Sequence, residues 1–215
     1  MLFFFCTFDI INLKTYKTMK NRKFNVVSGK MILSDPCYEL GTWCQGKISN
    51  VKNGEWVGII EQSDEGDWGV RNSRLISMNI DSMIKNPKLE MELMSSGELI
   101  PFTGGVDSGQ FGHFDFDNYR KDENVINSPK LFDDEWEQES GDKWYRACCY
   151  QTHKTDDSFG VVPYGVVSSS GYGDGSYLTY GIKDETDKWV GFMTIFIGDD
   201  EETDEWEEWE SEEVN

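Results

Sequence analysis

Short apolar runs that end in turn residues recur along most of this chain, and they constrain its fold more than any other feature. Between residues 24 and 197, runs rich in Val, Ile, Phe and Trp alternate with glycine, asparagine and aspartate. Such runs are typical of β-strands, and the residues between them favour tight turns. The chain has no repeat of fixed period and no linker long enough to divide two domains. The pattern predicts an α+β fold that is mainly antiparallel β, either a sandwich or a rolled sheet.

One or two helices are expected near residues 117–150. Residues 132–138 begin with three acids, an order that suits the positive end of a helix dipole. Residues 143–151 fit either a helix or a buried strand, and residues 89–94 fit either a strand or a short helix.

Two turns predict β-hairpins. Ser28 and Gly29 separate the β-type runs 24–27 and 30–33. Asn53 and Gly54 separate runs 48–51 and 55–61, and Asn-Gly is a strong hairpin signal because both residues tolerate a positive φ.

The net charge of −20 and the pI of about 4.3 argue against non-specific binding to nucleic acid or to an anionic membrane. Eleven acids and no base lie between Asp199 and Glu213, which leaves −9 for the rest of the chain. We therefore expect a peripheral extension over residues 1–23, one β-rich domain over 24–198 and a disordered acidic tail over 199–215. Trp206 and Trp209, three residues apart, offer a second interpretation of the tail as an acidic and aromatic docking segment.

The cysteines and the N-terminus indicate a reducing cytoplasm. The five cysteines are an odd number, and residues 2–11 are apolar but lack the basic start and the cleavage site of a signal peptide. Met19 is a plausible native start, which would leave residues 1–18 as an upstream extension. Ordinary buried thiols are favoured over a zinc site, and over a nucleophilic pair of Cys148 or Cys149 with a histidine, because no local signature supports either.

Several aspartates stand beside glycine, serine or proline, and they are the candidates for a metal site. Asp107, Asp115 and Asp174 would be the ligands of a hard cation such as Mg²⁺ or Ca²⁺, with His113 as the general base of a hydrolase. The competing interpretation is that these aspartates accept hydrogen bonds from their own turns. No EF-hand spacing is present, and no cofactor is expected otherwise.

The stretch 160–180 carries glycines at positions 171, 173 and 175 around Asp174. Successive N–H groups there can form an anion-binding nest, although Asp174 repels a phosphate, and a bent turn between strands is the alternative. Stacking of a nucleobase against aromatic rings beside one arginine is a related hypothesis, with core packing as its alternative. Its residues are Tyr38, Trp43, Trp68, Arg71, Tyr172 and Tyr177.

Six separate motifs stand out along the body of the chain: SDPCY (34–38), GTWC (41–44), NVKNGEW (50–56), WGVR (68–71), GVDSGQFGHFD (105–115) and VSSSGYGDGSY (167–177). With these motifs the chain resembles an uncharacterised family of bacterial and phage proteins, a domain of unknown function. The resemblance spans about residues 27–197 and implies a cytoplasmic protein associated with a phage or prophage, without implying a catalytic mechanism.

These observations favour a binding protein over an enzyme. We expect an accessory protein that binds a host factor or sequesters a small ligand such as a nucleotide, with no membrane contact. A metal-dependent hydrolase and an acidic mimic of nucleic acid are the alternatives. We expect three loops, residues 34–44, 105–117 and 168–177, to meet and form the site. The expected ligand-binding residues are Asp35, Tyr38, Trp43, Asp107, Ser108, His113, Asp115, Ser170, Tyr172, Asp174 and Tyr177.

Overall fold

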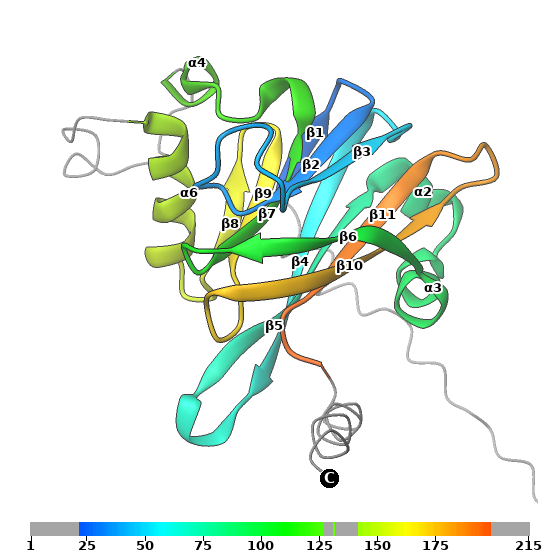
Figure 1. Ribbon diagram of the computed structural model, residues 1–215. Helices are drawn as coiled ribbons and strands as arrows, with labels where there is room; N and C mark the ends of the chain where they lie inside the picture. Colours follow the sequence, from blue (N-terminus) through cyan, green and yellow to red (C-terminus); the bar gives the residue numbers. More distant parts are fainter. Residues whose placement is uncertain (1–21, 127–130, 132–141, 199–215) are drawn as a thin grey trace, which may run out of the picture.

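The computed structural model describes residues 22–126, 131 and 142–198, which form two antiparallel β-sheets packed face to face (Figure 1). The first sheet has six strands, in the spatial order β1 (Lys23–Val26), β4 (Gly54–Asp64), β5 (Val70–Asn79), β11 (Trp189–Ile195), β10 (Gly175–Lys183) and β6 (Glu98–Val106). The second has five, in the order β3 (Gly46–Ser49), β2 (Lys30–Ser34), β7 (Gln110–Asp115), β9 (Gly165–Ser169) and β8 (Phe159–Val162). The predicted α+β fold of mainly antiparallel strands is confirmed.

Helices cover the outer face of each sheet (Figure 1). The six-stranded sheet carries α2 (Ile80–Lys85) and α3 (Leu89–Ser96), and the five-stranded sheet carries α4 (Asp122–Ile126) and α6 (Lys143–His153). Two single turns of 3-10 helix, η2 (Gly66–Trp68) and η3 (Phe116–Asn118), complete the described elements. The expected helices near residues 117–150 are therefore present as α4 and α6, whereas the helix expected over residues 132–138 lies outside the described residues.

The ambiguous run 143–151 is a helix because its apolar residues have helical spacing. Trp144, Ala147 and Cys148 stand at positions i, i+3 and i+4, and all three are buried against the five-stranded sheet. Asp142 caps the helix by accepting a hydrogen bond from the backbone N–H of Tyr145 at 2.9 Å.

The main core lies between the two sheets. Side chains that alternate along the strands meet there, among them Val26, Leu33, Leu75 and Val166. Trp56 is fully buried and stacks on Phe192, with ring centroids 6.0 Å apart and an interplanar angle of 11°. This apolar layer holds the two sheets together and thereby fixes the positions of the loops at their ends.

Both predicted hairpins are wrong. β1 pairs with β4 in one sheet while β2 pairs with β3 and β7 in the other, so Ser28 and Gly29 carry the chain between sheets. The Asn53–Gly54 turn likewise joins β3 and β4, which belong to different sheets. The two runs that flank each turn both contribute apolar side chains to one core. Placing the two runs in opposite sheets of a sandwich buries these side chains from both sides, which a flat hairpin cannot do.

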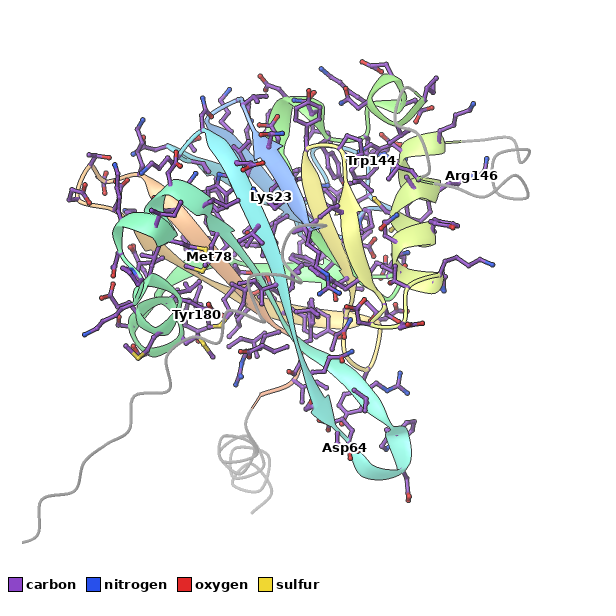
Figure 2. The ribbon with its side chains drawn as sticks, turned by 180° about the vertical axis from the view of Figure 1, so that it is seen from behind. Lys23, Asp64, Met78, Trp144, Arg146 and Tyr180 are labelled. Carbon is purple, nitrogen blue, oxygen red and sulfur yellow. The ribbon has the colours of Figure 1, made fainter. Side chains whose placement is uncertain are left out.

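The β4–β5 hairpin extends past the body of the six-stranded sheet as an arm. Figures 1 and 2 show it projecting, and Figure 2 labels Asp64 near its end. Its tip is open to water: Trp68 is 68% exposed and Val70 is 62% exposed. The arm brings its inner residues beside the loops that end the five-stranded sheet.

Candidate functional site

Asp35 joins two of the three predicted loops. Its carboxylate is fully buried and accepts hydrogen bonds from the backbone N–H groups of Asp107 (2.9 Å) and Ser108 (2.8 Å). It also accepts bonds from the Ser108 hydroxyl at 2.7 Å and from the N–H of Cys37 at 2.8 Å. Four donors occupy the lone pairs of this carboxylate, so it braces the loops and has no capacity left for a ligand.

The glycine turn, residues 171–175, joins the same assembly. Asp174 accepts a hydrogen bond from the N–H of Gly109 at 3.0 Å, and the N–H of Ser170 donates to the carbonyl of Gly109 at 3.0 Å. The Tyr177 hydroxyl donates a hydrogen bond of 2.6 Å to the carbonyl oxygen of Gly173, which stabilises the turn. The three loops named by the sequence therefore meet, as expected.

Backbone conformation explains two of these glycines. Gly171 and Gly173 have φ values of +58° and +113°, which side chains other than glycine rarely adopt. A Cβ atom on Gly171 would also lie 3.1 Å from the side chains of Phe196 and Ile197.

Asp115 lies away from these loops. Its carboxylate accepts hydrogen bonds from the N–H groups of Val27 (2.7 Å) and Ser28 (2.8 Å) at the crossover between sheets. β7 (Gln110–Asp115) separates it from Gly109 by about 20 Å, at 3.4 Å per residue. Among the described residues, no group of three or more His, Cys, Asp or Glu is placed to hold a metal ion. Asp107, Asp115 and Asp174 are thus not brought within reach of one ion.

His113 lies in the centre of the molecule instead of at a surface. Its Nδ1 is 2.8 Å from the Ser77 hydroxyl and its Nε2 is 2.9 Å from the Thr194 hydroxyl, which in turn lies 2.8 Å from the Thr179 hydroxyl. Burial lowers the pKa of His113 to about 3. A fully buried, neutral imidazole that joins the two sheets has no access to a substrate, so it cannot act as the predicted general base.

Two of the thiols, Cys37 and Cys148, are not activated. Burial, followed by a hydrogen bond with Asp35, raises the pKa of Cys37 to about 12. Cys148 is buried under α6, and this burial raises its pKa as well. Because hydroxyl groups occupy both ring nitrogens of His113, a pair of this histidine with Cys148 or Cys149 does not form.

A cleft of about 500 Å³ opens between the β4–β5 arm and the glycine turn. Arg71 and Tyr172 line it, and Asn72 and Gln62 lie on its arm side, where the Gln62 amide donates to Asn72 at 2.9 Å. The remaining lining residues are Val70, Gly109, Asp156, Ser158, Ser169, Gly171 and Gly173. A small number of polar groups that converge on a concavity is the usual form of a ligand site.

Two features make this cleft chemically specific. The Trp68 and Tyr172 rings meet edge to face, with centroids 6.2 Å apart, at its outer end. The Nε of Arg71 donates to the Trp68 carbonyl at 3.0 Å, and within the part of the chain that the structure describes its two Nη groups have no partner. The guanidinium is thus positioned by one bond and retains donors for an anionic group.

The predicted site residues fall into three groups. Tyr172 lines the cleft, and Ser170, Asp174 and Tyr177 hold the glycine turn in place through hydrogen bonds. Asp35, Tyr38, Asp107 and Ser108 form the bracing behind it; burial, and then a hydrogen bond with Asp107, raises the pKa of Tyr38. Trp43 lies further along the same β2–β3 loop as Asp35 and Tyr38, but it is 91% exposed and does not line the cleft. His113 and Asp115 have the structural roles described above.

The predicted stacking site comprised Tyr38, Trp43, Trp68, Arg71, Tyr172 and Tyr177, of which Arg71 and Tyr172 line the cleft. Sequence reasoning missed Gln62, Asn72, Asp156 and Ser158. Their signal is absent from local sequence, because they reach the cleft only through the pairing of β4 with β5 and the packing of the two sheets.

Comparison of the chain with protein-family models, curated proteins and solved structures found no match in any of the three. The resemblance to an uncharacterised bacterial and phage family therefore stays a prediction. Of the helices in the described ranges, none is long and apolar enough to cross a membrane.

Proposed function

We propose that the protein binds a small ligand, with a planar ring and a single anionic group, in the cleft between the β4–β5 arm and the glycine turn. A nucleoside monophosphate is the model ligand. The observation that carries the proposal is the Arg71 guanidinium, held at the cleft with uncommitted donors beside the Tyr172 ring. In the phage or prophage setting that the sequence suggests, such a protein would sequester its ligand in the cytoplasm.

Charge selects the ligand class. Arg71 and Asp156 line the cleft with opposite charges, and Asp174 and Glu65 add carboxylates at its edge. The single cation can balance one negative charge of a ligand. The carboxylates around it repel the additional charges of a triphosphate. The backbone N–H groups of the glycine turn can supply further donors to the same anion.

Isothermal titration with a panel of nucleosides and nucleoside mono-, di- and triphosphates tests the proposal. The monophosphates should bind best, and Arg71→Gln should weaken their binding about 10- to 100-fold, the cost of losing a charge-assisted hydrogen bond. Lys47→Gln is the matched control, because Lys47 is an exposed cation on β3, away from the cleft. No heat of binding from any member of the panel, or equal affinity in Arg71→Gln, would contradict the proposal.

The other predicted functions have less support. A hydrolase that uses Asp107, Asp115 and Asp174 is not proposed, because these carboxylates lie at different ends of β7. Mimicry of nucleic acid depends on residues 199–215, which are outside the described part of the chain, and it stays a prediction. So does the binding of a host protein, for which the exposed Trp43 would be the natural anchor.

A further inference from the structure

A second hollow, the groove, lies on the outer face of the six-stranded sheet and measures about 820 Å³. Met94 of α3, Leu178 and Tyr180 of β10, and Ile195 of β11 line it. Figure 2 shows Tyr180 beside α3, and a Cβ atom on Gly97 would lie 3.1 Å from the Cβ of Tyr180. The groove is thus bounded by the C-terminal end of α3 and by the parts of β10 and β11 that α3 does not cover.

The groove has an apolar side that is open to water, and Ser95, Ser96 and Ser176 form part of the rest of its lining. Met94 is 42% exposed and Leu178 is 44% exposed. Leu99 of β6 stands opposite Tyr180 in the strand pairing, and it extends the apolar surface with 50% exposure. Exposed apolar side chains that adjoin one another in this way mark a surface that another group covers.

The groove also differs in charge from the chain as a whole. The sequence has 40 acidic residues and 20 Lys and Arg residues, yet among the described residues that line the groove there is one cation, Arg74, and no carboxylate. Arg74 forms an ion pair with Glu61 at 2.9 Å. An acidic segment that supplies apolar side chains therefore meets less repulsion here than it would over a surface rich in carboxylates.

The chain itself leads into the groove. The N–H groups of Phe196 and Ile197 both donate to the carbonyl of Ser73, which fixes the end of the described chain against β5. Gly198, the last described residue, lines the groove. Residues 199–215 follow, and Trp206 and Trp209 are their only aromatic residues. Trp206 lies eight positions after Gly198, a reach of at most about 28 Å.

We propose that residues 199–215 dock into the groove of their own chain, with Trp206 and Trp209 covering Met94, Leu178 and Tyr180. Tryptophan is enriched among the residues that anchor protein interfaces, and methionine adapts its shape to an aromatic neighbour. The covalent connection at Gly198 keeps the local concentration of the segment high, so the contact needs little affinity of its own. The acidic residues between and beyond the two tryptophans remain in water.

Methionine oxidation provides a test with an internal reference. Met91 and Met94 both lie on α3 and are both exposed, but only Met94 lines the groove. The full-length protein and the full-length variant Trp206→Ser/Trp209→Ser are treated with dilute peroxide, and sulfoxide is followed at each methionine by peptide mass spectrometry. Oxidation follows exposure, so Met94 should oxidise about fivefold more slowly in the unmodified sequence than in the variant, while Met91 oxidises equally in both.

Two outcomes would overturn the proposal. The first is an equal ratio of Met94 to Met91 oxidation in the two proteins, which would mean that the tryptophans do not cover the groove. The second is protection of Met94 that grows with protein concentration, which would make a second copy the occupant. Leu178→Glu provides a further check from the groove side, because a buried carboxylate would expel the segment and expose Met94 in the same way. The melting temperature of each variant verifies that the fold is retained.

Discussion

Protonation of His113 should couple the stability of this protein to mildly acidic pH. The imidazole is fully buried between the sheets, and burial lowers its folded-state pKa to about 3 from an ordinary value of 6.5. The neutral ring is therefore favoured in the folded state, while the unfolded chain takes up a proton as the pH falls through 6.5. The stability that His113 contributes is complete above that pH and is lost progressively as the pH falls toward 3.

The magnitude follows from the two pKa values. Between pH 7.5 and pH 5 the unfolded chain gains nearly one proton at this site and the folded chain gains almost none, which costs about 2 kcal/mol of unfolding free energy. By pH 4 the loss is about 3 kcal/mol. The value at pH 5 hardly depends on the folded-state pKa, as long as that pKa stays well below 5.

Urea unfolding at pH 7.5 and pH 5 measures this loss. Other groups titrate in the same range, so the informative quantity is the difference between the parent protein and His113→Gln, whose amide cannot take up the proton. The parent should lose about 2 kcal/mol more than the variant over this interval. His153→Gln is the matched control, because it removes the other histidine of the chain at the exposed end of α6 and leaves the core unchanged. If parent and His113→Gln lose the same stability, the argument from burial is refuted.

Two further substitutions test the bracing of the cleft. Asp35→Asn replaces an acceptor of four hydrogen bonds with an amide whose N–H group faces two of the same donors. In urea titrations this substitution should lower the unfolding free energy by about 2–4 kcal/mol. The control Asp117→Asn, at an exposed residue, should change it by under about 0.5 kcal/mol. Gly171→Ala adds a Cβ both at positive φ and in close contact, and Gly66→Ala adds one at φ +62° with nothing within 4 Å. Thermal melting should therefore show the Gly66 variant losing about 1 kcal/mol and the Gly171 variant clearly more, and equal losses would contradict the crowding at Gly171.

The sequence predicted the strands well and their partners poorly. Runs such as 110–116 and 188–197 are strands because their β-branched and aromatic residues suit a pleated, buried surface, which is a local property. Pairing is not local: the turns at Gly29 and Gly54 have hairpin chemistry but serve as crossovers, because the core requires side chains from both sheets. Positive φ at both glycines is compatible with either path, so no residue in the turn distinguishes them.

The candidate site was predictable to the same degree. Glycine turns with aspartate correctly indicated three loops that meet, but the sequence could not show that backbone N–H groups would occupy Asp35 and Asp115. Whether a carboxylate is free for a ligand depends on the donors around it, and those donors come from distant segments. The arm side of the cleft, with Gln62 and Asn72, depends in turn on the pairing of two long strands.

The Asp35 brace has a consequence for the order of folding. Its bonds to the 107–108 backbone join residues 72 and 73 positions apart, and the bond from Gly109 to Asp174 spans 65 positions. Closing such long loops costs entropy that is recovered only after the strands on each side have paired, so these contacts should form late. During synthesis the glycine turn also emerges from the ribosome well after the arm. A nascent or partly folded chain therefore has no cleft, and ligand binding would report that both sheets have closed.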